Sequence, residues 1–247
     1  MLLRDRVYQA IRQAILTCEF EPGQELREQT LAERYNVSRS PIRDSLLRLE
    51  QENLVTVLPR QGYLINEIAM SDVEDLMGLR LLIEPACAAG AAGADDTALR
   101  ALDRFRIPEP LEQTEAEFLQ YNTAFHRAVI DLAGNARMTA IGLELDEQYQ
   151  RVLRVSLRTF HFQRVRHAFA DHAAIIDALQ AHDADRASGL CYGHSARSHT
   201  RVLAEFRHSP LRPPDLLGGL IKSEMRQNDS PDAGPPLEGQ PTMDLYH

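Results

Sequence analysis

Two arginines stand four residues apart where an apolar segment begins near the N-terminus. The stretch YNVSRSPIRDSLLRLEQENLV, residues 35–55, places Arg39 and Arg43 on either side of a Ser-Pro pair. We expect Ser40 to cap a helix and Pro41 to begin it, because a proline in the first helical turn loses no hydrogen bond. A guanidinium at the leading end of such a helix can bind guanine O6 and N7 in the DNA major groove. The stretch therefore predicts recognition of double-stranded DNA.

Three histidines in the second half of the chain could bind a metal ion. His126, His172 and His194 fall on three different predicted helices, and Asn122 precedes His126 by one helical turn. Neutral imidazole is the commonest protein ligand for first-row metals, and facing helices can bring such ligands together. Spacing alone leaves ordinary surface or core histidines as an alternative, because the chain contains nine histidines.

The segments around the two arginines follow the order of a winged helix-turn-helix domain, which we place in residues 1–68. The four-residue spacing of Val7, Ile11 and Ile15 predicts a first helix. The segment EQTLAERYN predicts a short second helix that Asn36 ends, and the arginine-bearing segment predicts a third. The apolar faces of the second and third helices should consist of Leu31, Tyr35, Ile42, Leu46, Leu47 and Leu49. The segments LVTVL and YLINEI, separated by the turn PRQG, predict a β-hairpin as the wing.

Four further residues of this domain are candidates for contact with DNA, and one of them is Ser40, which lies between the two arginines. Arg60 and Gly62 lie at the predicted hairpin tip, and Arg27 at the start of the second helix is a candidate phosphate contact. A single exposed arginine is usually only solvated, so the prediction depends on the ordered set. Residues 1–68 contain nine arginines against ten carboxylates, a net charge of -1. The positive surface of this domain must therefore be local.

Residues 69–209 predict an all-helical bundle, so the fold class is mainly α. The apolar periodicity is helical throughout this region, and it contains no strong strand signal. Gly134 and Asn135 should end one helix, and Asp183 should stand near the start of another. The six helices are expected at 71–90, 95–106, 111–133, 136–158, 165–181 and 184–206. Residues 210–247 contain seven of the thirteen prolines and predict a disordered tail.

Bulk composition excludes several classes of protein. A length of 247 residues with 44% hydrophobic and 26% charged residues suits two globular domains. The chain lacks an apolar run of about 20 residues, and its N-terminus acquires charges too early for a secretion signal. Cys18, Cys87 and Cys191 are too few and too far apart to predict a disulfide framework or a cysteine-rich zinc site. A net charge of -9 argues against a protein that coats nucleic acid non-specifically. We expect a cytoplasmic protein without a membrane partner.

The segment PGQELREQTLAERYNVSRSPIRDSLLRLEQENLVTVLPRQGYLI resembles the DNA-binding domain of the GntR family of bacterial transcription regulators. The resemblance extends over most of residues 5–68. It implies that Arg39, Arg43 and the wing glycine Gly62 contact operator DNA. Gln29 stands where some relatives have a base-reading arginine, so the operator sequence of those relatives cannot be transferred to this chain.

Residues 71–206 resemble the all-helical effector domain of the FadR subgroup, called the FCD domain, in the segments LRLLIEP, NTAFHRAVIDLAGN and DHAAIIDALQAHDADRASGLCYGH. The resemblance implies a divalent metal ion held by one aspartate and three histidines, which match His126, His172 and His194. Asn122 occupies the aspartate position, and its neutral amide brings no negative charge. Zinc or nickel should tolerate this change better than manganese or magnesium. A metal-free pocket whose histidines bind the effector directly is the alternative.

The resemblance also implies a role for an arginine on the first helix of the bundle. Arg80 matches a position at which family members often place an arginine, and we expect it to bind an effector carboxylate. Arg151 and Arg154 on the fourth helix of the bundle are further candidates for effector binding. Each of these two could equally be an ordinary surface or helix-pairing charge.

These features together predict a ligand-responsive transcription repressor. It should bind a pseudo-palindromic operator as a homodimer and respond to a small carboxylic acid. A hydrolytic enzyme could instead use the three histidines to hold a zinc ion. Against this alternative, Glu144 and Asp146 are expected on the solvated side of a helix, and no other acid-base partner stands near the histidines. The second alternative is a DNA-binding protein without an effector, which the substitution at Asn122 keeps open.

Overall fold

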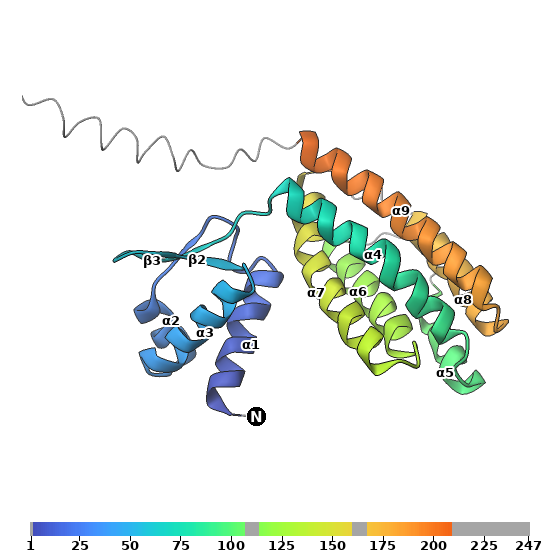
Figure 1. Ribbon diagram of the computed structural model, residues 1–247, viewed down its shortest axis with the longest axis horizontal. Helices are drawn as coiled ribbons and strands as arrows, with labels where there is room; N and C mark the ends of the chain where they lie inside the picture. The colour runs from blue at the N-terminus through green and yellow to red at the C-terminus, as the bar shows by residue number, and fades with distance from the viewer. Residues whose placement is uncertain (1, 107–113, 160–166, 209–247) are drawn as a thin grey trace, which may run out of the picture. The chain divides into compact units, whose positions relative to one another are not determined.

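The structure is a computed structural model that describes residues 2–106, 114–159 and 167–208 (Figure 1). The predicted tail at 210–247 lies outside the described residues, as do the starts of the helices expected at 111 and 165. The described part is mainly helical, with one small sheet near the N-terminus. The predicted fold class is therefore confirmed.

The N-terminal region contains three helices and a three-stranded antiparallel sheet. The helices are α1 (Leu3–Leu16), α2 (Glu28–Tyr35) and α3 (Arg39–Gln51), and the strands are β1 (Glu25–Leu26), β2 (Val55–Leu58) and β3 (Gly62–Ile65). The strand order is β1-β3-β2, with Thr56 paired to Leu64 in the hairpin. Strand β1 was not predicted, because two residues are too few to show a strand pattern. The core of this region consists of side chains from all three helices and the sheet, among them Ile11, Ile15, Leu31, Ile42, Leu46, Leu49 and Ile65.

The start of α3 differs from the prediction by two residues. The helix begins at Arg39, and Ser38 in extended conformation occupies the cap position that we assigned to Ser40. Ser40 is an exposed residue of the first turn instead. Sequence could not fix this boundary, because a proline loses no hydrogen bond at any position of the first turn. The prediction of Leu47 as a core residue was also wrong, since its side chain is 44% exposed.

The turn of the hairpin requires unusual backbone conformations. Arg60 has a φ of 64° and Gly62 a φ of 130°. A Cβ atom at Gly62 would lie too close to the carbonyl oxygen of Leu26 in the neighbouring strand. Gly62 is therefore needed for the sheet itself, whatever contact it makes with DNA.

The rest of the described chain is helical. The elements are α4 (Met70–Ala91), α5 (Asp96–Arg100), the 3-10 helix η1 (Ala101–Phe105), α6 (Glu115–Asp131), α7 (Ala136–Thr159), α8 (His167–Gln180) and α9 (Ala184–His208). These match the six predicted helices except that the one expected at 95–106 is divided into α5 and η1. Every described strand lies before residue 66, as the sequence indicated.

Polar side chains fix several of these helix ends. Asp95 accepts hydrogen bonds from the backbone N–H groups of the first turn of α5. Thr114 and Glu117 form a capping box at the start of α6. Gly134, with a φ of 70°, follows the end of α6, and the Asn135 side chain accepts from two N–H groups of α7. These contacts confirm the stop predicted at Gly134-Asn135.

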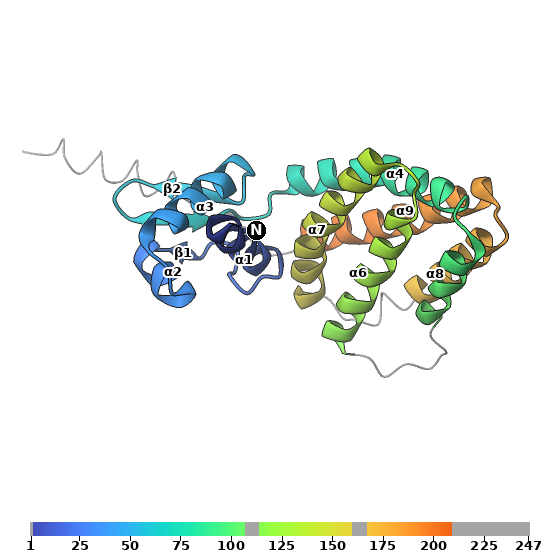
Figure 2. The same ribbon diagram turned by 90° about the horizontal axis from the view of Figure 1, so that it is seen from below.

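The helices pack in pairs around one core. Helix α4 packs along α9, α8 packs against α9, and α6 packs against α7 (Figure 2). The core between them is aromatic in one part, where Phe105, Phe118, Tyr121, Phe125 and Phe169 lie close together. No single helix of the described ranges has both the length and the apolar character of a membrane span; only α4 combined with the bent continuation Asp96–Phe105 passes that test.

Candidate nucleic-acid interface and metal centre

The two arginines at the start of α3 are exposed, and residues of α2 hold both. Arg39 donates through Nη2 to the side-chain oxygen of Gln29 at 2.9 Å. Arg43 donates through Nε and Nη2 to the two carboxylate oxygens of Glu28, each at 2.8 Å. The leading end of α3 therefore presents two ordered guanidinium groups. The sequence predicted both arginines but not their partners.

The other predicted DNA contacts lie on the surface of the same region. Arg27 occupies the cap position of α2, and Arg60 lies in the hairpin turn. A surface cavity of about 590 Å³ is lined by residues of both segments, including Arg27, Arg60 and Gly62. Contact of any of these residues with DNA, and of Ser40, stays a prediction.

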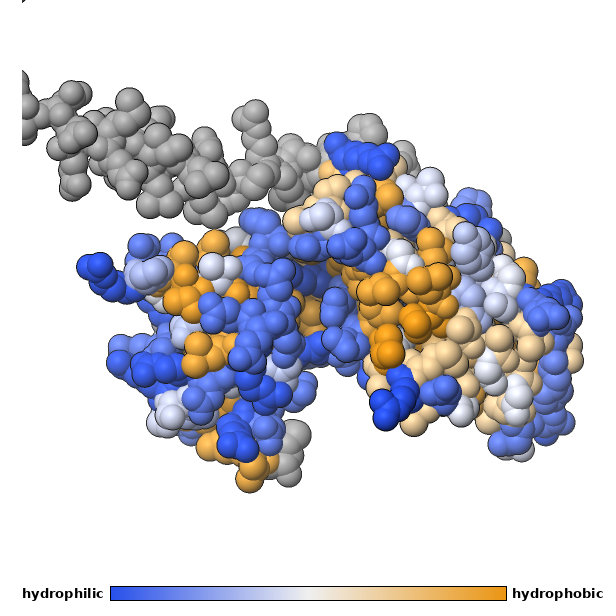
Figure 3. All heavy atoms as spheres, in the orientation of Figure 1, coloured by the Kyte–Doolittle hydropathy of each residue, from blue (hydrophilic) through white to orange (hydrophobic). Residues whose placement is uncertain are grey.

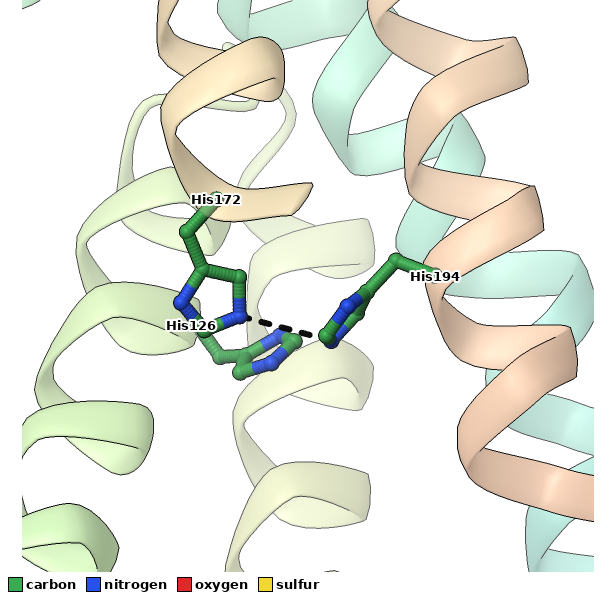
Figure 4. A group of neighbouring side chains, drawn as sticks. All are labelled: His126, His172 and His194. Carbon is green, nitrogen blue, oxygen red and sulfur yellow. Dashed lines mark hydrogen bonds between the residues drawn. The ribbon is translucent and has the colours of Figure 1, made fainter. Parts of the chain in front are cut away.

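The three predicted histidines converge in the interior of the bundle. His126 on α6, His172 on α8 and His194 on α9 are all buried (Figure 4). One nitrogen from each ring lies within 4.8 Å of the other two. Nε2 of His172 and Nε2 of His194 are 3.3 Å apart, the contact drawn as a dashed line in Figure 4. Burial excludes the part of the alternative that placed these three histidines on the surface.

Neighbouring side chains orient two of the three rings. Nδ1 of His172 is 3.0 Å from the hydroxyl of Tyr121, and its ring stacks on Phe125 with centroids 3.9 Å apart. Nδ1 of His194 is 3.1 Å from a carboxylate oxygen of Asp171. Such outer contacts fix which nitrogen is free to coordinate a metal. In both rings the other nitrogen, Nε2, is the one that faces the cluster.

The histidine cluster has the donor set of a metal site. Nε2 of His126 is buried without a hydrogen-bond partner among the described residues, and a coordinated cation would satisfy it. Burial lowers the pKa of His126 to about 3 and that of His172 well below its ordinary value. The rings of His126 and His172 are therefore neutral at pH 7, the form that coordinates metal ions. The residues present fit a divalent cation that accepts nitrogen ligands.

Asn122 is buried close to His126 along α6, but its role as a fourth metal ligand remains a prediction. It is buried on α6 one turn before His126. Its side chain is neutral, so the nearest fixed negative charges to the three rings come from other residues. Asp171 contacts His194, and the buried carboxylate of Glu84 acts electrostatically on His126. No sequence pattern predicted a role for either carboxylate.

Arg80 is less available to an effector than we expected. It is fully buried, and its Nε donates to Glu84 on the same helix at 2.6 Å. Its guanidinium also lies over the ring of Tyr149, 3.4 Å from the centroid. Ser195, next to His194 on α9, donates to the other oxygen of Glu84 at 2.6 Å. One donor of Arg80, Nη2, has no partner within the described chain.

The two other candidates for effector binding, Arg151 and Arg154, differ in whether their side chains have partners. Arg151 is buried and donates to the main-chain oxygen of Asn66, so it has a structural partner. Arg154 is half-buried, and its Nε lacks a partner among the described residues. Binding of an effector by Arg80 or Arg154 stays a prediction.

A surface cavity of about 260 Å³ adjoins the histidine cluster between α8 and α9. His194 lines it together with Asp171, Arg197 and Arg201. Arg197 pairs with Asp171 at 2.6 Å, while Nε of Arg201 has no partner among the described residues. Sequence reasoning missed Arg201, because nothing in its neighbourhood distinguishes it from other surface arginines of a long helix.

The expectation that Asp146 is solvated was wrong. Glu144 is exposed, but Asp146 is only 1% exposed and one of its oxygens has no partner among the described residues. Burial raises the pKa of Asp146 to about 7, and the nearby Glu84 adds to the increase while Arg80 opposes it. The side chain points inward because α7 packs against both α4 and α6.

We expect the substitution Asp146→Asn to stabilise the protein at pH 8. The folded-state pKa of about 7 lies above the ordinary value of 3.8, so the carboxyl favours folding only at low pH. Its stabilising effect falls as the pH rises from about 4 to about 7, and an amide does not titrate. The gain in free energy of unfolding should be roughly 1–4 kcal/mol at pH 8 and much smaller at pH 4. Urea unfolding at both pH values measures it, with the exposed neighbour Glu144→Gln as control. An equal effect at both pH values would contradict the prediction.

Two family models match separate parts of this chain. Residues 3–65 match the family described as bacterial regulatory proteins, gntR family, and residues 75–197 match the FCD domain. A transcriptional regulator in an unstable DNA locus of Streptomyces ambofaciens is 30% identical over 209 residues, which is 84% of this chain and 88% of that protein. The transcriptional repressor RspR of Escherichia coli is 27% identical over 188 residues, 74% of this chain and 81% of that protein.

Solved structures show the same fold. The structure of E. coli McbR/YncC has a TM-score of 0.71 and 18% identity, with 83% of this chain and 99% of that chain covered. A structure described as a putative transcriptional regulator GntR from Rhodococcus sp. RHA1 has a TM-score of 0.66 and 22% identity, with 81% and 97% covered.

Proposed function

This chain belongs to the gntR family of bacterial regulatory proteins and carries an FCD domain, and from this premise we propose that it is a cytoplasmic transcription repressor released from its operator by a small carboxylic acid. DNA-binding regulation follows from the family. The direction of control, the effector, the metal and the dimer are the proposal. One observation carries it: a single chain combines an exposed arginine-tipped helix with a buried cluster of three histidines.

The proposed reading head is the leading end of α3. Arg39 and Arg43 are solvent-exposed there, and arginine offers the planar pair of donors that guanine O6 and N7 require. The cavity between Arg27 and the hairpin turn provides further donors for backbone phosphates. One such head spans only a half-site, so a pseudo-palindromic operator needs two heads related by a two-fold axis.

An exposed apolar surface on the bundle supports the proposed homodimer. Leu79 and Leu82 on α4 and Ile141 on α7 are 50%, 70% and 49% exposed. Figure 3 shows a hydrophobic area over the part of the bundle where α4 and α7 run in Figure 1. A self-complementary contact between two copies would remove these side chains from water.

We expect Leu82→Glu to convert the dimer to monomer. The side chain is 70% exposed in the single chain, so a glutamate there is compatible with folding but would place two like charges near a two-fold axis. Sedimentation velocity measures the change in mass, and operator affinity should fall with it. Leu3→Glu, at a leucine 56% exposed on α1, is the matched control. A variant that sediments like the parent protein would exclude this surface as the dimer interface.

The proposed effector site combines the histidine cluster with nearby arginines. When a divalent cation is bound, it supplies a Lewis-acid centre to which a carboxylate can attach. His126, His172 and His194 would hold that cation, with Asn122 as a neutral fourth ligand. The unpartnered donors of Arg80 and Arg201 suit the second oxygen, or a second carboxylate, of the effector.

The contacts of Arg80 indicate how the two sites could be coupled. An effector carboxylate at Arg80 competes with Glu84, and Glu84 also accepts a hydrogen bond from Ser195 of α9. Breaking that contact would change the packing of α4 on α9. Only residues 66–69 separate α4 from strand β3, so a shift of α4 is passed directly along the chain. A coupling of about 1–3 kcal/mol changes operator affinity by roughly 5- to 150-fold.

The hydrolytic alternative is excluded by the family. The matched family and the named relatives are transcription regulators rather than enzymes. The repressor direction is supported by the names of two relatives, the repressors RspR and GlaR of Escherichia coli, and each name describes that protein.

A titration with carboxylic acids tests the proposal. The operator is first selected by the protein from a pool of random-sequence duplexes. The zinc-loaded protein, bound to this duplex, is then titrated with a panel of small mono-, di- and hydroxy-carboxylic acids. Release by one member in a zinc-dependent manner is expected. If no acid changes the affinity with or without zinc, the protein is a DNA-binding regulator without this effector, the alternative that Asn122 raised.

A further inference from the structure

One carboxylate lies inside the proposed reading head. Glu28 begins α2, and both of its oxygens accept hydrogen bonds from Arg43 of α3 at 2.8 Å. The Arg43 side chain is 61% exposed, while that of Glu28 is 20% exposed. The mostly buried Glu28 therefore holds the exposed side chain of Arg43, and the guanidinium is ordered before any DNA is bound.

The atoms used in this pair decide what Arg43 can still do. A guanidinium has five N–H donors in a rigid plane. Glu28 takes donors from Nε and Nη2, which form the side edge of the group. The end edge retains two parallel N–H groups, one on Nη1 and one on Nη2. Two parallel donors are what a bidentate contact with guanine O6 and N7 requires.

The surroundings of Glu28 keep its carboxylate charged and in place. Hydrogen bonds from Arg43 are the largest cause of the lowered pKa of Glu28, and Tyr63 of β3 also hydrogen-bonds it. The position of Glu28 in the first turn of α2 further favours a negative charge. The wing strand, α2 and α3 thus meet at one carboxylate.

The second arginine provides a natural comparison. Arg39 is held by Gln29, a neutral amide that itself donates to Glu33 at 3.1 Å. Both arginines are therefore positioned by consecutive residues of α2, but only Arg43 is neutralised. A neutralised guanidinium gains little from a bare phosphate, whereas a bidentate contact with guanine is still available to it.

We propose that Glu28 is a positioning residue for base recognition. It binds the side edge of the Arg43 guanidinium, so that the end edge of Arg43 is free to bind guanine. It also suppresses binding of Arg43 to DNA phosphates. The inference rests on the proposed reading head. It adds that Glu28 increases the ratio of specific to non-specific DNA affinity. The carboxylate of Glu28 is repelled by the DNA phosphates. Only the bidentate contact between Arg43 and a guanine offsets this repulsion.

Binding measurements on full-length protein test the role of Glu28. The probes are the duplex that the wild-type protein selects from a random-sequence pool and a duplex with the same composition but shuffled half-sites. For Glu28→Gln, affinity for the shuffled duplex should rise, and the ratio of selected to shuffled affinity should fall about tenfold. Freeing Arg43 adds one phosphate contact, so the slope of log K against log salt for the shuffled duplex should steepen by about one.

Two controls separate this role from a structural one. Glu50→Gln removes the same charge from α3, from a residue that no reading arginine contacts; it should leave the ratio and the slope unchanged. In an Arg43→Ala background, Glu28→Gln should no longer steepen the slope. Circular dichroism confirms that each variant is folded, and Glu28→Asp, which keeps the charge with a shorter reach, should retain the slope of the wild-type protein.

Equal loss of affinity for both duplexes, with ratio and slope unchanged, would mean that Glu28 only stabilises the domain and would overturn the inference. A steeper slope that persists in the Arg43→Ala background would overturn it as well. If the wild-type protein selects no duplex at all, the proposed reading head has failed and the inference falls with it. These results are distinguishable from one another.

Discussion

Alanine at both Arg39 and Arg43 is expected to abolish specific operator binding while the protein remains folded. Each bidentate contact between an arginine and guanine contributes enough discrimination that losing two should weaken specific binding roughly 30-fold or more. Both side chains are exposed, so the thermal unfolding temperature should change little. Fluorescence anisotropy with the selected duplex and with the shuffled duplex measures specific and non-specific affinity separately.

The control for this double variant is Arg48→Ala. Arg48 lies on the same helix, but its guanidinium stacks over Tyr8 of α1 at 3.7 Å from the ring centroid, away from the reading end. Its removal should leave the specificity ratio intact. Retained operator affinity in the Arg39→Ala, Arg43→Ala protein would refute α3 as the reading helix.

His172→Ala is expected to bind operator normally but to lose metal and the response to the effector. His172 is fully buried and provides one of the three converging nitrogens. Two histidines and a neutral amide should not retain zinc through dialysis, because each lost ligand weakens binding strongly. Plasma emission spectroscopy should give close to one zinc per chain for the parent protein and almost none for the variant. The dose–response curve to any active carboxylic acid should become flat.

The cost in stability needs a separate control. The ring of His172 packs on Phe125, so its truncation should lower the free energy of unfolding by about 2–4 kcal/mol. His182→Ala, at an exposed histidine just after α8 that does not line the cavity beside the cluster, should change neither zinc content nor response. An unchanged dose–response curve in the His172→Ala protein would rule out the histidine cluster as the effector site.

Both predictions depend on features that were visible in the sequence. The four-residue spacing of Arg39 and Arg43 and the turn residues around them were enough to place them at a helix start. Helical periodicity of apolar residues predicted the helices of the bundle, with ends that differ by up to four residues and one helix divided into α5 and η1. The convergence of the histidines was different, since it was expected from the family resemblance rather than from spacing.

Boundaries and short strands were the parts of the fold that sequence could not determine. Either Ser38 or Ser40 could have capped α3, because the N–H groups of the first helical turn have no partner within the helix. Strand β1 has two residues and exists only because β3 offers it hydrogen-bond partners. Leu47 is as apolar as Leu46, and only the direction in which α3 packs distinguishes them.

By itself the sequence determined the order of the long helices and of the hairpin, because this order follows from local periodicity. It also indicated the side chains that we propose contact bases and metal, through residue chemistry and the family resemblance. Tertiary structure decided which charges meet. Glu28 on Arg43, Glu84 on Arg80 and Asp171 on His194 join residues whose separations range from four to 23 positions. Whether a carboxylate is solvated, as Glu144 is, or buried, as Asp146 is, depends on which face of a helix its neighbours cover. Electrostatic pairing acts through space, and no local pattern encodes it.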